Sequence, residues 1–72
     1  MNDLTNVRNA LIDGLENDFT DQQIQFIDKR LKEIADENNL SADDLDYYCW
    51  ADSSLMFDCI FTGKQFDPDL FD

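Results

Sequence analysis

The amino-acid sequence predicts an all-α protein, a small bundle of three to four helices followed by a short acidic and aromatic C-terminal tail. Gly occurs only twice and Pro once, so few residues are available to interrupt helices. Apolar residues recur at intervals of three and four over much of the chain, which is the period of an α-helix. No segment alternates cleanly between apolar and polar residues, and no Asn-Gly or Asp-Gly turn is present, so β-hairpins are not expected.

The first helix is expected over residues 3–15. Its apolar residues fall on one helical stripe, formed by Leu4, Val7, Leu11 and Leu15. Gly14 lies near the end of this stripe. It is expected to be the C′ residue, because glycine adopts the left-handed conformation that ends many helices, or a weak point just before the helix ends. The polar link that follows is short, which favours an antiparallel neighbour.

The second helix has the clearest sequence signature. Thr20 and Gln23 have the spacing of a capping box. The apolar residues that follow recur at intervals of three, four and three, at Ile24, Ile27, Leu31 and Ile34. Asn38 and Asn39 are the expected end of this helix. Opposite charges at i and i+4 on its outer face suggest weak ion pairs, namely Asp28–Lys32, Lys29–Glu33 and Lys32–Asp36.

A third helix is expected to begin after Ser41, which is a favourable N-cap residue. Residues 51–54 then interrupt the apolar pattern with several weak helix formers. We therefore expect a break there, with Asp52 or Ser53 capping a fourth helix over residues 55–62 that Gly63 closes. The alternative is one continuous helix over residues 42–62.

Residues 1–63 are expected to form a single helical domain, and residues 64–72 a C-terminal tail. The tail contains Phe66, Leu70 and Phe71, and it either frays or folds back onto the bundle. Segment 45–61 carries apolar residues on two sides. Its second stripe consists of Tyr47, Trp50, Phe57 and Phe61. A helix that is apolar on two sides either lies centrally in a bundle or is buried against a partner.

The chain is strongly acidic and its charge is unevenly distributed. It contains 17 Asp and Glu against 5 Lys and Arg, for a net charge of −12. Residues 1–35 hold seven acids and four bases, whereas residues 36–72 hold ten acids and one base, Lys64. Acids in first helical turns, such as Asp21, Asp43 and Asp44, are favoured by the helix dipole. The remaining excess costs stability through mutual repulsion, which suggests a partner that rewards it.

Composition also argues against several kinds of site. The chain has no His, no Gly-rich phosphate loop and no nucleophile motif, so we expect no enzyme activity and no cofactor. Cys49 and Cys59 are expected to be reduced and buried; a disulfide between them is the next possibility, and a zinc site is not expected. Residues 36–47 depart from the calcium-binding EF-hand loop at several ligand positions. We therefore expect no metal site.

Direct binding to nucleic acid or to an anionic membrane is not expected, because five scattered cations face 17 carboxylates. No apolar run is long enough to span a membrane. The N-terminal residues lack the basic and apolar regions of a secretory signal, so we expect a cytoplasmic protein of a bacterial host.

These observations favour a small acidic protein-binding inhibitor encoded by a phage or mobile element. It would act as a DNA mimic and block a basic nucleic-acid-binding protein, as an anti-restriction, anti-CRISPR or polymerase inhibitor does. The residues expected to contact the partner combine acids with aromatic anchors: Asp43, Asp44, Asp46, Tyr47, Trp50, Asp52, Phe57 and Asp58. The alternatives are a structural or assembly module, including an obligate homodimer subunit, and an antitoxin or immunity protein for a basic toxin.

Overall fold

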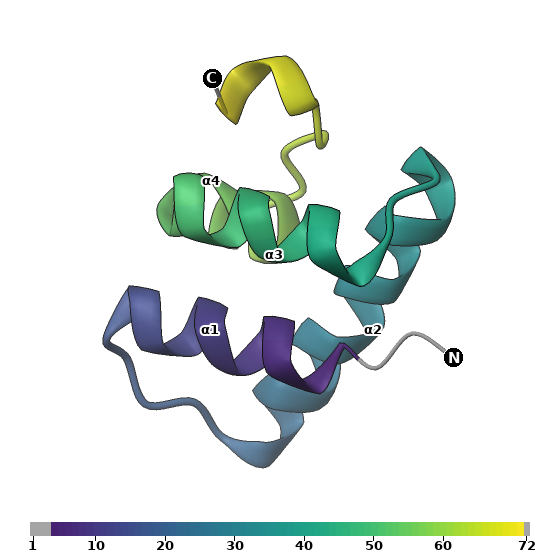
Figure 1. Cartoon of the computed structure of the whole chain (residues 1–72). Helices are drawn as coiled ribbons and strands as arrows, with labels where there is room; N and C mark the ends of the chain where they lie inside the picture. Colours follow the sequence, from purple (N-terminus) through teal and green to yellow (C-terminus); the bar gives the residue numbers. More distant parts are fainter. Residues whose placement is uncertain (1–3, 72) are drawn as a thin grey trace.

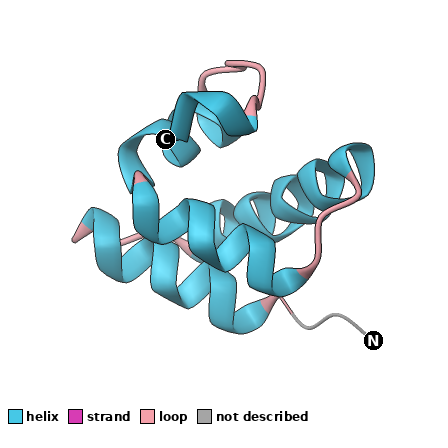
Figure 2. Ribbon diagram, turned by 45° about the horizontal axis from the view of Figure 1, so that its top comes forward, coloured by secondary structure: helices cyan, strands magenta, loops and turns pink. Residues whose placement is uncertain are grey.

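The computed structural model describes residues 4–71 and confirms the all-α prediction. Its elements are α1 (Thr5–Leu15), α2 (Asp21–Asn38), α3 (Ala42–Ala51), α4 (Ser53–Phe61) and a short 3₁₀ helix, η1 (Pro68–Phe71). Within residues 4–71 there is no strand. Helices α1 and α3 lie side by side, and η1 lies across α3 on the side away from α1 (Figure 1). The helices enclose one core, and loops join them at the surface (Figure 2).

Helix α1 ends at Leu15, and Gly14 lies just before this end instead of at the C′ position. Its C-cap is Glu16, which adopts the left-handed conformation with φ of 55°, whereas Gly14 lies within the helix. Gly14 is there because α4 approaches closely. A Cβ at position 14 would lie 3.1 Å from the Ser53 Oγ and 3.2 Å from the Ser53 Cβ. At the other end, the helix begins at Thr5, and its N-cap residue is Leu4, which makes no side-chain cap hydrogen bond.

Helix α2 begins with the predicted capping box. The Gln23 amide donates to the Thr20 hydroxyl at 3.2 Å, and the Thr20 amide donates to the Gln23 side chain at 2.9 Å. The helix ends at Asn38, and Asn39 adopts the left-handed conformation. The predicted i,i+4 ion pairs are wrong. Within residues 4–71 the ion pairs of α2 are instead Asp28 with Arg8 of α1, at 3.2 Å, and Arg30 with Glu33.

The predicted break between the third and fourth helices is confirmed, so residues 42–62 are not one helix. Asp52 marks the break with an extended backbone, φ of −158° and ψ of 90°. Its amide donates to the Tyr48 carbonyl at 3.1 Å, and its carboxylate accepts from the Leu55 amide at 3.0 Å. Asp52 therefore ends α3 and caps α4. Helix α3 begins with its own capping box, formed by Ser41 and Asp44.

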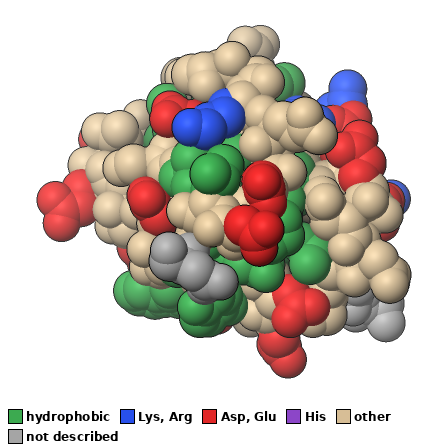
Figure 3. All heavy atoms as spheres, turned by 90° about the horizontal axis from the view of Figure 1, so that it is seen from above, with side chains coloured by type: hydrophobic (Ala, Val, Ile, Leu, Met, Phe, Trp, Pro, Cys, Tyr) green, Lys and Arg blue, Asp and Glu red, His purple; other side chains and the backbone are tan. Residues whose placement is uncertain are grey.

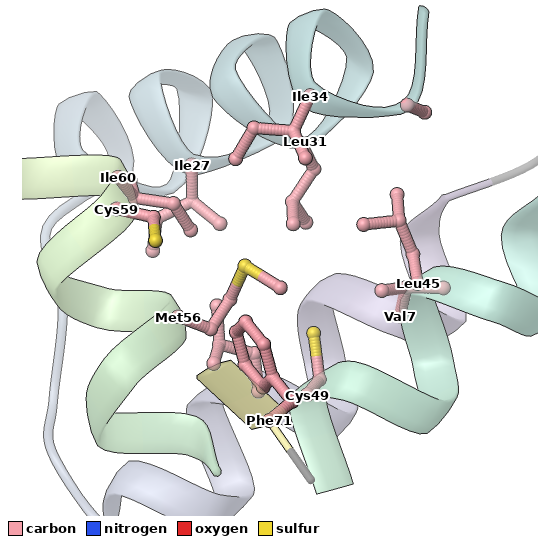
Figure 4. Packing of buried hydrophobic residues seen from close by; sticks show 12 residues of the cluster. Val7, Ile27, Leu31, Ile34, Leu45, Cys49, Met56, Cys59, Ile60 and Phe71 are labelled. Carbon is pink, nitrogen blue, oxygen red and sulfur yellow. The ribbon is translucent and has the colours of Figure 1, made fainter. Parts of the chain in front are cut away.

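The core combines side chains from all four α-helices and from η1 (Figure 4). Its fully buried large residues are Leu11, Ile27, Leu31, Ile34, Leu45, Met56 and Cys59. Cys49 and Cys59 are both buried and free, as predicted. Phe71 is only 7% exposed and completes the core, so the described part of the tail folds back onto the bundle.

Candidate protein-binding surface

The outer face of α3 presents the most exposed large aromatic side chains of residues 4–71. Trp50 is 68% exposed and Tyr47 is 56% exposed. Leu45 and Cys49, on the opposite side of the helix, are buried in the core. Positions 43, 47 and 50 are spaced by four and three residues, and position 46 lies beside them, so all four share one side of the helix. We call Asp43, Asp46, Tyr47 and Trp50 the α3 face.

The acids of this region divide into two kinds. The Asp44 carboxylate accepts from the Ser41 amide at 3.2 Å, and the Asp52 carboxylate caps α4, so both have structural roles. Asp43 is exposed, and neither it nor Asp46 forms an ion pair or side-chain hydrogen bond with any residue of 4–71. These two carboxylates are therefore available to a cation from outside the chain.

Asp46 is half-buried, and its negative charge acts on Cys49 in the core. Burial of Cys49, with a smaller contribution from the negative charge of Asp46, raises the pKa of the Cys49 thiol to about 12. Burial likewise raises the pKa of the Cys59 thiol. Both thiols are consequently neutral near pH 7, where a nucleophilic cysteine would need to form a thiolate.

The charged residues of α3 and α4 are all acidic. The chain has no Lys or Arg between Lys32 and Lys64, so α3, α4 and the link between them carry only acids. On the face that includes the tail, acidic side chains stand among hydrophobic ones (Figure 3). A cationic partner that approaches the α3 face would therefore not be repelled by any positive charge on α3 or α4.

The tail supports the α3 face from one side. The Tyr47 ring contacts the Tyr48 ring edge-on, with centroids 5.3 Å apart. Tyr48 in turn packs against Phe66 at 5.4 Å and Phe71 at 5.1 Å. Tyr48 therefore links the tail to the α3 face, a position that was not predicted. Its place on the buried stripe and the apolar residues of the tail are the features of the sequence that indicate it.

Phe57 lies in a different aromatic cluster. It is half-buried, with its ring centroid 4.7 Å from that of Phe61 and 6.5 Å from that of Phe19. Phe61 also contacts Phe26, which is 41% exposed on α2. The predicted stripe of Tyr47, Trp50, Phe57 and Phe61 is thus divided, because the break at Asp52 reorients α4 relative to α3. Asp58 is half-buried on α4. Contact of these residues with a partner stays a prediction.

A shallow open groove of about 480 Å³ lies between the end of α2 and the tail, lined by Asn38, Gln65, Phe66, Asp67, Pro68 and Leu70. Asp67 is its single titratable side chain. Across residues 4–71, no group of three or more His, Cys, Asp or Glu side chains is placed to hold a metal ion. The α3 face is therefore the better candidate for function.

Comparison with known proteins adds no assignment: no family model, no curated protein and no solved structure matches the chain. Among the described helices, none is both long and apolar enough to cross a membrane.

Proposed function

We propose that this protein is a small acidic inhibitor, encoded by a phage or mobile element, that binds a basic nucleic-acid-binding protein in the cytoplasm of a bacterial host. The observation that supports this best is the α3 face. It combines two exposed aromatic side chains with two unpaired carboxylates, in a stretch that lacks any base. Aromatic anchors surrounded by complementary charge are typical of interfaces in which a few residues dominate affinity.

A nucleic-acid-binding groove has the complementary chemistry. Such a groove presents Lys and Arg at intervals suited to phosphates, which advance about 3.4 Å per charge along one DNA strand. Carboxylates on successive turns of a helix lie about 5–6 Å apart. An acidic helical surface can therefore occupy a cationic channel and exclude DNA from it. Opposite net charges would also accelerate association at low ionic strength.

An antitoxin or immunity protein for a basic toxin would use the same electrostatic attraction and would differ only in its partner.

An assembly module or homodimer subunit is favoured by a different surface. Phe26 is exposed on α2 and lies at the edge of the aromatic cluster of Phe19, Phe57 and Phe61. The ring centroids of Phe26 and Phe61 are 5.4 Å apart. Measurement of the mass in solution separates this second function, because it requires a dimer or a larger complex.

The test of the inhibitor proposal is affinity capture from a bacterial lysate at low and at moderate salt, with and without added duplex DNA. We expect a nucleic-acid-binding protein to be retained, and DNA to displace it because both compete for one groove. Retention should weaken as salt rises. Capture that is insensitive to both DNA and salt would contradict the proposal and favour the assembly module.

A further inference from the structure

The α3 face combines its negative charge with exposed aromatic rings. Trp50 presents a large exposed indole, and Asp46 precedes it by one helical turn on the same side of α3. Tyr47 lies beside Asp46, and its ring packs edge-on against Tyr48. An aromatic ring and an unpaired carboxylate therefore stand on successive turns of one helix, where residues four apart lie about 5–6 Å from each other. The Asp46 carboxylate forms no ion pair with any residue of 4–71.

We propose that the α3 face binds an arginine side chain of the partner, with the guanidinium stacked on the Trp50 indole and paired with the Asp46 carboxylate. This inference rests on the proposed function and names the group that the partner supplies. Tryptophan is the best aromatic acceptor of a cation, and arginine is the cation that most often stacks on it. The planar guanidinium can stack on a ring and still donate hydrogen bonds from its edge to a carboxylate.

Lysine fits the same surface less well. Its ammonium group is compact and strongly hydrated, so it loses more solvation on contacting an aromatic ring and has no flat surface to stack. The aromatic side chains of the α3 face are open to solvent. Selectivity there should consequently be a several-fold preference for arginine over lysine.

A second copy of this chain is a poor source of the guanidinium. Its Arg8 side chain is paired with Asp28, at 3.2 Å. Its Arg30 side chain is paired with Glu33 and also donates to the Cys59 carbonyl at 3.3 Å. Both arginines are therefore engaged within their own chain, and the ligand is expected to come from a different protein.

The test uses the intact protein with hexa-arginine and hexa-lysine peptides, which carry equal charge. Trp50 is the single tryptophan of the chain, so its fluorescence reports directly on the α3 face. We expect the Kd for hexa-arginine to be about three- to five-fold lower than that for hexa-lysine. Equal Kd values for the two peptides, or no binding of either, would overturn the inference.

Variants separate stacking from net charge, with calorimetry as the readout so that loss of the tryptophan does not remove the signal. Trp50→Leu should abolish the preference for arginine, because leucine is apolar but has no aromatic face; Trp50→Phe should retain part of it. Asp46→Asn should weaken hexa-arginine binding more than Asp13→Asn, which removes the same charge from α1. A preference that survives Trp50→Leu, or equal effects of the two Asp variants, would overturn the inference.

These results are distinguishable from a failure of the proposed function. DNA-displaceable capture of a nucleic-acid-binding protein without any arginine preference would refute the arginine contact alone. Absence of that capture, together with equal peptide affinities, would refute both. Trp50 is exposed, and the Asp46 carboxylate forms no ion pair with any residue of 4–71, so circular dichroism is expected to show unchanged helical content in each variant.

Discussion

Asp52 determines where α3 ends and α4 begins, so its replacement should have a defined energetic cost. Its carboxylate is the acceptor for the Leu55 amide at 3.0 Å, at a helix N-terminus whose first amides have no partner within the helix. Asp52→Ala removes that acceptor and leaves the backbone unchanged. Loss of such a cap costs about 1 kcal/mol, within a range of roughly 0.5–2 kcal/mol.

The assay is thermal unfolding followed by circular dichroism. In a domain of this size, a loss of about 1 kcal/mol lowers Tm by roughly 4–8 °C. Asp52→Asn should remain within a few tenths of a kcal/mol of the parent, because asparagine caps helices about as well as aspartate. Ser54→Ala, at an exposed position of the same turn, controls for a general effect of alanine. The cap assignment would be refuted if Asp52→Ala were as stable as the parent, or if Asp52→Asn lost as much as Asp52→Ala.

Three further predictions concern the core and its closure. Phe71→Ala should destabilise the fold by about 2–4 kcal/mol because Phe71 is buried, whereas Leu70→Ala, at a neighbouring residue 50% exposed, should cost far less; urea unfolding of both variants compares them. Helix propensity alone would make Gly14→Ala stabilising by roughly 1 kcal/mol. The contact with Ser53 should cancel this gain in stability, and a Ser53→Gly background should restore it. A gain in both backgrounds would contradict that contact. The Cys49 thiol, whose pKa is raised from 9.0 to about 12, should resist iodoacetamide at pH 8 until the protein unfolds. Since the folded state holds this proton more tightly, its contribution to stability is complete below pH 9 and should be lost as pH rises toward 12; alkylation of the folded protein at the rate of a free thiol would contradict this.

Helix boundaries were predictable where one local hydrogen bond decides them. Three helices begin where a side-chain oxygen accepts from an amide of the first turn that has no partner within the helix; these oxygens belong to Thr20, Ser41 and Asp52. Such a hydrogen bond depends only on residues that are neighbours in the sequence. The capping box at Ser41 was missed because Asp44 takes the position usually held by Glu or Gln. For Gly14 the sequence left two positions open, the C′ residue or a residue just before the helix end, because the crowding by α4 depends on tertiary packing.

The candidate site was predictable in composition but not in extent. The acids and aromatics of the α3 face follow from helical spacing within one element. The expected continuity with Phe57 failed, because a break of one residue at Asp52 changes the direction of α4 by an amount that the sequence does not specify. The pairing of Asp28 with Arg8, and the contact of Tyr48 with Phe71, likewise join residues far apart in the chain.

The central claim is that the α3 face, and not the overall negative charge, binds a basic protein. The most direct test compares two variants with the same net charge: Asp43→Lys with Asp46→Lys on the α3 face, and Asp13→Lys with Asp18→Lys on α1 and the following loop. Both pairs avoid the capping residues Asp44 and Asp52. We expect the first pair to lose DNA-displaceable capture of a nucleic-acid-binding protein, while the second pair keeps most of it at moderate salt. Equal loss in both pairs would show that net charge alone determines binding, and would contradict the account.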